Sequence, residues 1–251
     1  MADVRVGTFL TLPGAAAAEL LAEPFDVVLI DLEHAALSRR DAQEMTIGAQ
    51  AAGAQVLVRV PAAARDLITV MLDAGVDGIV LADVADPAVA ATAVSWLRHA
   101  PDGVRGWGPR RASSRGRRDR ATLAQPALWV QIERRGGVAA AEQLAAVDGV
   151  EALVVGTADL SFSLGAPLDS GTAEMREAVD QVRRACQAAG VAFGVAGALD
   201  TAPRELLADA SILLHATDAR LAAAAVDAAA ARLRELVGAK LSSDLTPNDI
   251  K

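Results

Sequence analysis

Charged side chains and one imidazole follow four hydrophobic runs of this chain, at the points where those runs end. They are Asp31, Glu33 and His34 after the second run, Arg59 after the third, Glu133 after the fifth and Asp159 after the sixth. The carboxyl ends of parallel strands meet at one edge of a sheet, and in barrel enzymes that edge holds the active site. The pattern therefore predicts an enzyme whose site gathers these side chains.

Glu133 and Asp159 are the candidate metal ligands, on consecutive strands. Two carboxylates with several open positions suit a hard divalent ion such as Mg2+ or Mn2+, with water and substrate oxygens as the remaining ligands. The alternative is that each carboxylate caps a helix or joins an ion pair, because Asp is a favoured residue at helix N-termini.

His34 and Arg59 are the candidate base and the candidate anion-binding group. An imidazole just past a strand can act as a general base near neutral pH, although a lone loop histidine is usually only a surface residue. Arg59 ends a strand in apolar surroundings, so either Asp31 or Glu33 pairs with it or it binds an anionic substrate. His215, at the end of the eighth run, is a lesser candidate at the same edge.

Short apolar runs alternate with Ala-rich amphipathic stretches, which predicts a parallel sheet buried on both faces. The eight predicted strands are Val4–Leu10, Asp26–Asp31, Gln55–Val60, Gly78–Ala82, Leu128–Glu133, Glu151–Gly156, Val191–Val195 and Ser211–Leu214. The predicted helices are Ala15–Ala22, Arg40–Ala52, Asp66–Ala74, Pro87–Arg98, Thr172–Ala189 and Leu221–Leu236. Eight repeats favour a single (β/α)8 TIM barrel over residues 1–240, followed by a frayed polar tail over 241–251. The runner-up is an open doubly wound sheet, but no Gly-x-Gly-x-x-Gly motif follows the first strand.

The composition excludes several classes of protein. The 251 residues are 53% hydrophobic, which is enough for a large core, and the net charge of −8 argues against a nucleic-acid binder, which needs a basic face. The one cysteine, Cys186, excludes an internal disulfide. No signal peptide and no apolar run of membrane-spanning length is evident, so we expect a soluble cytoplasmic protein without membrane contact.

The segment from Pro101 to Gln125 has no clear strand or long helix and is rich in arginine. Its arginines are Arg105, Arg110, Arg111, Arg115, Arg117, Arg118 and Arg120. Clustered charges are often only a solvated surface. Because a long connection is usually functional and Arg suits carboxylates and phosphates, the alternative interpretation is an anion-facing flap over the site.

Five motifs occur in order with compatible spacing. They are Asp31-x-Glu33-His34, Val58-Arg59-x-Pro61, Gly103-Val104-Arg105-Gly106-x-Gly108 with Arg111-Ala112-Ser113, Val130-Gln131-Ile132-Glu133, and Gly156-x-Ala158-Asp159-Leu160-Ser161. Each motif alone is weak. Together, from Gly7 to about Leu236, they resemble the HpcH/HpaI family of metal-dependent class II pyruvate aldolases in the citrate lyase-like superfamily.

The resemblance implies a metal and substrate site. Glu133 and Asp159 would hold a divalent ion, Mg2+, Mn2+ or Co2+, which pyruvate would chelate through its keto and carboxylate oxygens. Gln131 and the backbone around Gly156 and Ala158 would contact the substrate. The implied partners are therefore a small 2-oxo acid and an aldehyde.

The resemblance also implies the proton chemistry. His34 would be the base, acting through a metal-bound water, and Arg59 would stabilise the enolate. Asp73 would raise the basicity of His34. Because Asp73 ends a helix away from the catalytic edge, it would reach His34 across a subunit interface of a homo-oligomer, typically a hexamer with helices exchanged between neighbours.

The implied reaction forms or cleaves a carbon–carbon bond between a pyruvate enolate and an aldehyde. A Schiff-base aldolase is excluded, because Lys240 and Lys251 are both C-terminal. One alternative is a CoA-thioester lyase of the malyl-CoA and citrate lyase type with the same metal site. The other is a catalytically silent barrel, against which the intact polar residues argue.

The chain departs from the family pattern at three places. Thr157 replaces the usual Pro, which we expect to loosen the turn that presents Asp159. Leu32 stands where a small Gly is common, and the segment from Gly103 to Gln131 is shorter than is typical and richer in Arg. These changes affect the acceptor side of the reaction, so the family's usual aldehydes are not carried over.

Overall fold

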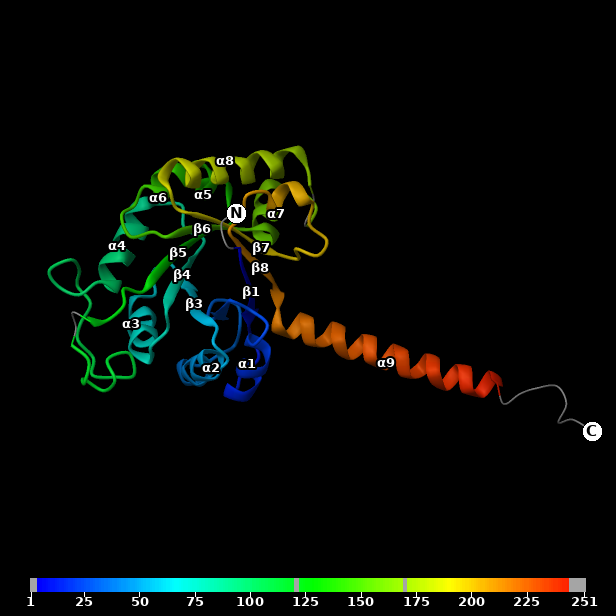
Figure 1. Ribbon diagram of the computed structural model, residues 1–251. Coiled ribbons are helices and arrows are strands. Elements are labelled where there is room, and N and C mark those ends of the chain that lie inside the picture. Colours follow the sequence, from blue (N-terminus) through cyan, green and yellow to red (C-terminus); the bar gives the residue numbers. More distant parts are fainter. Residues whose placement is uncertain (1–3, 120–121, 169–170, 244–251) are drawn as a thin grey trace, which may run out of the picture.

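The computed structural model describes residues 4–119, 122–168 and 171–243. Its eight parallel strands pair each with the next, and β8 pairs with β1, so the sheet closes into a barrel (Figure 1). The strands are β1 (Arg5–Leu10), β2 (Val27–Asp31), β3 (Gln55–Pro61), β4 (Gly78–Ala82), β5 (Ala127–Ile132), β6 (Ala152–Gly156), β7 (Ala192–Gly197) and β8 (Ile212–Thr217). The predicted TIM barrel is confirmed, and the open sheet is excluded.

Helices surround the barrel, and the six predicted ones are all present. They are α1 (Ala15–Ala22), α2 (Arg39–Ala51), α3 (Arg65–Ala74), α4 (Pro87–Leu97), α8 (Ala173–Ala189) and α9 (Asp218–Ser243). The additional elements are short: α5 (Arg135–Ala139), α6 (Ala141–Ala145), α7 (Thr157–Leu164) and the 3-10 helix η2 (Arg204–Leu207). No helix in the described ranges is long and apolar enough to cross a membrane.

Side chains along each strand point alternately into the barrel and toward the surrounding helices. The interior is filled by one buried cluster that includes Leu29, Leu57, Val80, Trp129 and Val154. A second, larger buried cluster lies between the strands and the helices. Both faces of each strand are therefore apolar, and polar side chains find room mainly at the strand ends.

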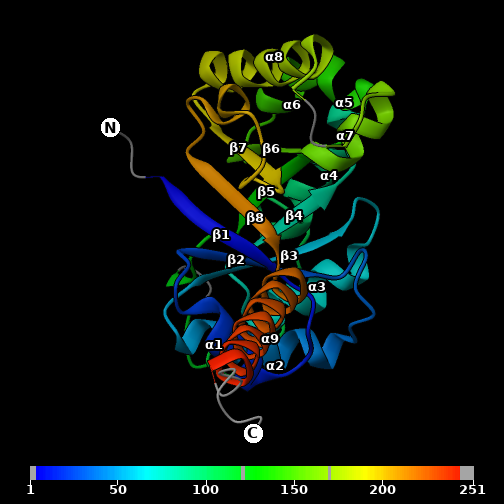
Figure 2. The ribbon, with the colours of Figure 1, turned by 90° about the vertical axis from the view of Figure 1, so that its right-hand side faces the viewer.

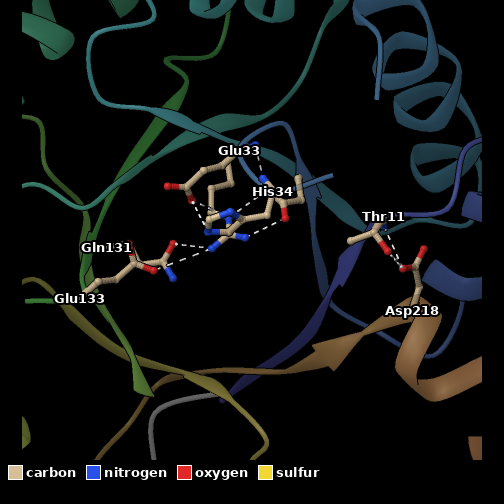
Figure 3. A network of polar contacts seen from close by, with 8 residues as sticks. Thr11, Glu33, His34, Gln131, Glu133 and Asp218 are labelled. Atoms are coloured by element: carbon tan, nitrogen blue, oxygen red, sulfur yellow. Dashed lines mark hydrogen bonds and ion pairs between the residues drawn. The ribbon is translucent and has the colours of Figure 1, made fainter. Parts of the chain in front are cut away.

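The last helix, α9, projects away from the barrel (Figure 1), and Figure 2 looks approximately along it. Its first residue, Asp218, is buried and accepts hydrogen bonds from the Thr11 N–H (2.9 Å), the Thr11 hydroxyl (2.6 Å) and the Leu12 N–H (3.0 Å). These bonds join the end of β8 to the loop after β1, where the barrel closes (Figure 3). The helix continues to Ser243, into the segment predicted as a tail, and residues 244–251 lie outside the described ranges.

Replacing Asp218 by Ala should destabilise the closure of the barrel, because the N–H groups of Thr11 and Leu12 lose a charged acceptor. We expect the free energy of unfolding to fall by about 2–4 kcal/mol, as measured by denaturant titration. Asp227 on the same helix is exposed, so Asp227→Ala is the control and should change stability by no more than about 0.5 kcal/mol. Equal effects of the two substitutions would contradict this assignment.

Candidate active site

The carboxyl ends of the strands surround a cavity of about 270 Å³. Seven of the predicted site residues line it: His34, Arg59, Gln131, Glu133, Gly156, Ala158 and Asp159. Figure 3 shows the side chains of Glu33, His34, Gln131 and Glu133 converging on one place in the barrel mouth. The structure thus brings together residues from the ends of β2, β3, β5 and β6, while Asp73 lies elsewhere.

The guanidinium of Arg59 is the centre of this arrangement and is only 8% exposed. Its Nε donates to Asp31 Oδ1 at 3.0 Å and its Nη2 donates to Asp31 Oδ2 at 2.7 Å, which makes a bidentate pair. Its Nη1 lies 3.5 Å from Gln131 Oε1 and 3.8 Å from Glu133 Oε1. The ring centroid of Phe9 lies 4.8 Å from Cζ, within cation–π range. Of the alternatives that the sequence left open for Arg59, the structure shows a bidentate pair with Asp31, and Glu33 lies further away at 3.4 Å.

Asp31 also shapes the turn that follows β2. Its Oδ1 accepts the N–H groups of Glu33 at 3.0 Å and His34 at 3.3 Å, as Asp often does in turns. Burial alone would raise the pKa of Asp31, but the hydrogen bonds and charge of Arg59 outweigh it and hold the pKa below its usual 3.8. Burial would likewise lower the pKa of Arg59, and Asp31 outweighs it in the opposite direction. Both partners therefore stay charged.

Glu133 is buried among other carboxylates. Burial raises its pKa to about 7, and the negative charges of Glu33 and Asp159 act in the same direction. The positive charge of Arg59 would lower the pKa of Glu133, but Arg59 Nη1 lies 3.8 Å from Glu133 Oε1 and the shorter contacts of Arg59 are with Asp31. The effects of burial and of the neighbouring carboxylates on this pKa are therefore larger than that of Arg59. Without a bound cation, the ionised form of Glu133 therefore destabilises the folded protein.

The charges around the cavity are unbalanced in a way that fits a cation. Asp31, Glu33 and Glu133 each have an oxygen within 4 Å of the guanidinium of Arg59, and Asp159 acts on Glu133 from the same cavity. Hard divalent ions often take one or two protein carboxylates and complete their shell with water and substrate oxygens. Within the described residues no group of three or more His, Cys, Asp or Glu side chains forms a metal cage. The residues present would fit an open two-carboxylate site better than a closed structural one, and the assignment of Glu133 and Asp159 as metal ligands stays a prediction.

Gly156 is required where β6 passes the polar side chains. A Cβ atom there would lie 2.9 Å from Gln131 Nε2 and 2.9 Å from Glu133 Oε1. These distances are too short for a Cβ atom, so a larger residue would force the ends of both side chains to shift. The glycine of the fifth motif is thus explained by close approach.

Asp159 lies in the first turn of α7 and does not cap that helix. The N-cap position is held by Gly156 without a side-chain hydrogen bond, so the alternative of Asp159 as an N-cap is wrong. Thr157 is buried and its hydroxyl donates to the Ala196 carbonyl at 3.1 Å. This hydrogen bond ties the turn to β7, while the expectation that Thr157 loosens the turn relative to Pro stays a prediction. Pro is favoured at N1 of a helix, and this hydroxyl fixes the same position by another means.

The two histidines at this edge differ in their surroundings. The His34 side chain is 65% exposed, with Nε2 3.7 Å from Glu33 Oε2, so it can exchange protons with substrate and solvent. His215 accepts the N–H of Leu199 at Nδ1 (3.1 Å) and is not among the residues that line the cavity. His34 is thus the better placed candidate base.

Asp73 lies at the end of α3, which is the amino-terminal edge of the barrel. Arg105 Nη2 is 3.7 Å from Asp73 Oδ1, and Asp73 lines a second cavity together with Arg110 and Arg115. It cannot contact His34 of the same chain, in agreement with the expected contact across an interface. That contact stays a prediction.

The arginine-rich segment lies at the same amino-terminal edge. Arg111 Nη1 donates to Gln50 Oε1 at 2.6 Å and to the carbonyls of Ala74 and Gly75 at 3.3 and 3.4 Å, which stabilises the C-terminus of α3. None of the described arginines of this segment lines the central cavity. The interpretation of a flap over the chain's own site is therefore wrong, and Arg120 lies outside the described residues.

One charged residue that lines the cavity was missed in the sequence. Arg220 lies in the first turn of α9, and its side chain is exposed at the cavity. A cation in the first turn of a helix is unfavourable next to the positive end of the helix dipole. This unusual position is the sequence signal that could have identified Arg220.

Glu133→Gln should stabilise the metal-free protein most at high pH. The folded pKa of about 7 lies above the unfolded value near 4.5, so ionisation opposes folding above pH 7 and not below about pH 4.5. We expect the substitution to raise the melting temperature at about pH 8 and to have much less effect at about pH 4.5. Calorimetry with chelator present measures this, and an equal shift at both pH values would contradict the cause given for the raised pKa.

Comparison with known proteins places the chain in a family. A hydroxypyruvate/pyruvate aldolase of Rhizorhabdus wittichii is 36% identical over 194 residues, which cover 74% of this chain and 76% of that protein. A 4-hydroxy-2-oxovalerate aldolase of Rhodococcus jostii is 34% identical over 239 residues, or 92% of each chain. The crystal structure of an HpcH/HpaI aldolase/citrate lyase family protein from Burkholderia cenocepacia has a TM-score of 0.85 and 35% identity, covering 93% of this chain and 95% of that one. The model of the HpcH/HpaI aldolase/citrate lyase family matches residues 5–224, so the chain belongs to this family.

Proposed function

We propose that this protein forms or cleaves a carbon–carbon bond between the enolate of pyruvate and an aldehyde. The observation that carries the proposal is the grouping of Arg59, Glu133 and Asp159 around one small cavity at the barrel mouth. Carbon–carbon lyase chemistry follows from the family, and the names of the two aldolase relatives support a 2-oxo acid as the nucleophile.

A divalent ion is part of the proposal, with Glu133 and Asp159 as its protein ligands. Bound there, Mg2+ or Mn2+ would act as a Lewis acid that stabilises negative charge on the keto oxygen of pyruvate. The guanidinium of Arg59 has three carboxylates within 4 Å, those of Asp31, Glu33 and Glu133, and this local excess of negative charge supports the choice of site.

The remaining residues handle the proton and the developing charge. His34, which is open to solvent, takes a proton from the methyl carbon of pyruvate. Arg59 is already fixed by Asp31 and stabilises the negative charge of the enolate without having to reorient. The enolate carbon then attacks the carbonyl carbon of the aldehyde, whose oxygen takes up a proton, and cleavage is the reverse.

Exchange of the pyruvate methyl protons with deuterated water tests enolisation without knowledge of the aldehyde. We expect exchange, followed by NMR, in the presence of Mg2+ or Mn2+ and its loss on chelation. Asp159→Asn and His34→Ala should each lower the exchange rate by about 100-fold or more, because each removes one part of the site.

The matched control is His215→Asn, since His215 lies at the same edge but outside the cavity lining; it should exchange at nearly the normal rate. Metal-independent exchange, or none with any metal, would contradict the proposal. In the second case a thioester lyase would be tested next with acetyl-CoA.

We further propose that the protein is a homo-oligomer in which α9 packs on a neighbouring copy. The helix stands clear of its own barrel (Figure 1), and four of its apolar side chains are 59–67% exposed: Val226, Leu233, Leu236 and Val237. Apolar side chains gathered on a projecting helix indicate a surface that another chain covers. Asp73, which lies away from its own His34, would then complete a neighbour's site.

Subunit mixing tests the role of Asp73. His34→Ala and Asp73→Ala proteins should each exchange pyruvate protons slowly, because every site lacks one partner. Mixed oligomers formed by unfolding and refolding the two together contain some sites with both residues, so we expect exchange to be partly restored. If the mixed protein exchanges no faster than the two separate variants together, Asp73 does not act across subunits.

A further inference from the structure

A cavity of about 870 Å³ lies at the amino-terminal edge of the barrel, between the arginine-rich segment and the loops that precede β3 and β4. It shares no lining residue with the cavity at the barrel mouth. Asp77 is the one carboxylate among the lining residues that the structure describes. Five arginines line the same cavity: Arg105, Arg111, Arg115, Arg117 and Arg118. Positive charge is thus concentrated here, in a chain whose net charge is −8.

Little of this charge is compensated by the chain itself. Asp77 Oδ2 accepts hydrogen bonds from the Val56 N–H at 2.8 Å and from Gln50 Nε2 at 3.0 Å, so it is engaged with neutral donors. The guanidinium of Arg111 donates to neutral oxygen acceptors. Across the described ranges, the ion pairs include Arg105 but none of the other four arginines of this cavity. An anion that entered would therefore meet guanidinium groups without a carboxylate partner.

Arg105 is the buried member of the group. Its side chain is only 7% exposed, and its ion pair with Asp73 is long, at 3.7 Å from Nη2 to Oδ1. Its Nε is buried and has no hydrogen-bond partner among the described residues. Burial lowers the pKa of this guanidinium, and the charge of Asp73 opposes that shift without cancelling it. A buried cation with so distant a partner destabilises the folded chain, and a bound anion would relieve this.

The backbone that carries the exposed arginines is fixed by a tight turn around Ser113, which is buried. The Ser113 hydroxyl accepts the Gly116 N–H at 3.1 Å, and the Ser113 carbonyl accepts the Arg118 N–H at 3.0 Å. The φ angles of Ser114 and Arg115 are +48° and +60°, a conformation that costs energy in residues other than glycine. The guanidinium groups thus extend from a defined scaffold, which reduces the entropy lost when they bind a ligand.

We propose that this cavity binds a small molecule that carries a chain of phosphate groups, such as inorganic triphosphate or the triphosphate of a nucleotide. A guanidinium can bind two oxygens of one phosphate through parallel hydrogen bonds. One phosphate would engage only some of the five guanidinium groups, whereas a cavity of about 870 Å³ has room for several phosphates. The site lies at the opposite edge from the barrel mouth, so the proposal does not depend on the aldol reaction.

Calorimetric titration of the full-length protein with sodium triphosphate tests the proposal. The protein is first freed of divalent metal, so that no ion at the barrel mouth can hold the ligand. We expect one triphosphate to bind per chain, at least about 10-fold more tightly than inorganic phosphate, which makes fewer charged hydrogen bonds. Citrate should also bind at least about 10-fold more weakly, because each carboxylate offers two acceptor oxygens where a phosphate offers three.

Titration with ATP identifies the source of the phosphate chain. Affinity equal to that of triphosphate would mean that the phosphate chain alone is recognised. Tighter binding of ATP would mean that the cavity also holds the nucleoside. Both results support the site.

The variant that tests the arginines combines Arg117→Gln with Arg118→Gln. Both side chains are exposed, so the protein should fold normally. We expect triphosphate to bind about 10- to 100-fold more weakly, because charged hydrogen bonds are lost. The matched control combines Arg39→Gln with Arg40→Gln, an adjacent exposed pair that carries the same charge but does not line this cavity. Its affinity should change by less than about 2-fold, since salt screens distant charges.

A second control locates the ligand. Asp159→Asn should bind triphosphate as the wild-type protein does, because Asp159 lines the other cavity. Loss of binding in this variant would place the ligand at the barrel mouth and overturn the proposal. Absent binding by the wild-type protein, equal losses in the two double variants, or citrate binding as tight as that of triphosphate would also overturn it.

Discussion

A single buried guanidinium holds the mouth of this barrel together. Arg59 binds Asp31 through two hydrogen bonds and lies 3.4 Å from Glu33 and 3.8 Å from Glu133. Without it these carboxylates would be buried with no countercharge, a situation that destabilises proteins by about 3–5 kcal/mol. The same network holds more carboxylates than guanidinium groups. One set of contacts therefore both stabilises the mouth of the barrel and leaves negative charge beside the cavity.

The two edges of the barrel carry different sets of polar residues. Every predicted site residue but one lies at the carboxyl edge, where the strand ends leave the packed interior. Asp73 and the arginine-rich segment lie at the opposite edge, where Arg111 stabilises the end of α3. Asp73 is thus separated from His34 within one chain, and under the proposed arrangement the two meet only between chains.

The strands, the barrel and four charged or titratable residues of the cavity, His34, Arg59, Glu133 and Asp159, could be predicted from the sequence, because a buried parallel strand leaves a continuous apolar run and its end leaves a polar residue. The other three predicted lining residues, Gln131, Gly156 and Ala158, were implied only by the resemblance to the family. The short helices could not: α5 and α6 have too few turns for a periodic pattern. The place of the arginine-rich segment was missed because its contacts, such as Arg111 with Gln50, join residues far apart in the chain. Arg220 was missed because its alanine-rich surroundings look like any exposed helix.

The closure of the barrel by Asp218 bears on how the chain folds as it is synthesised. The carboxylate and the Thr11 N–H that it accepts are separated by 207 residues. Until β8 has left the ribosome, β1 is an edge strand with open hydrogen-bonding groups, which are prone to pair with other chains. The barrel therefore completes its sheet only after β8 has been synthesised, and nascent chains that stop before this strand expose an edge that the closed barrel covers.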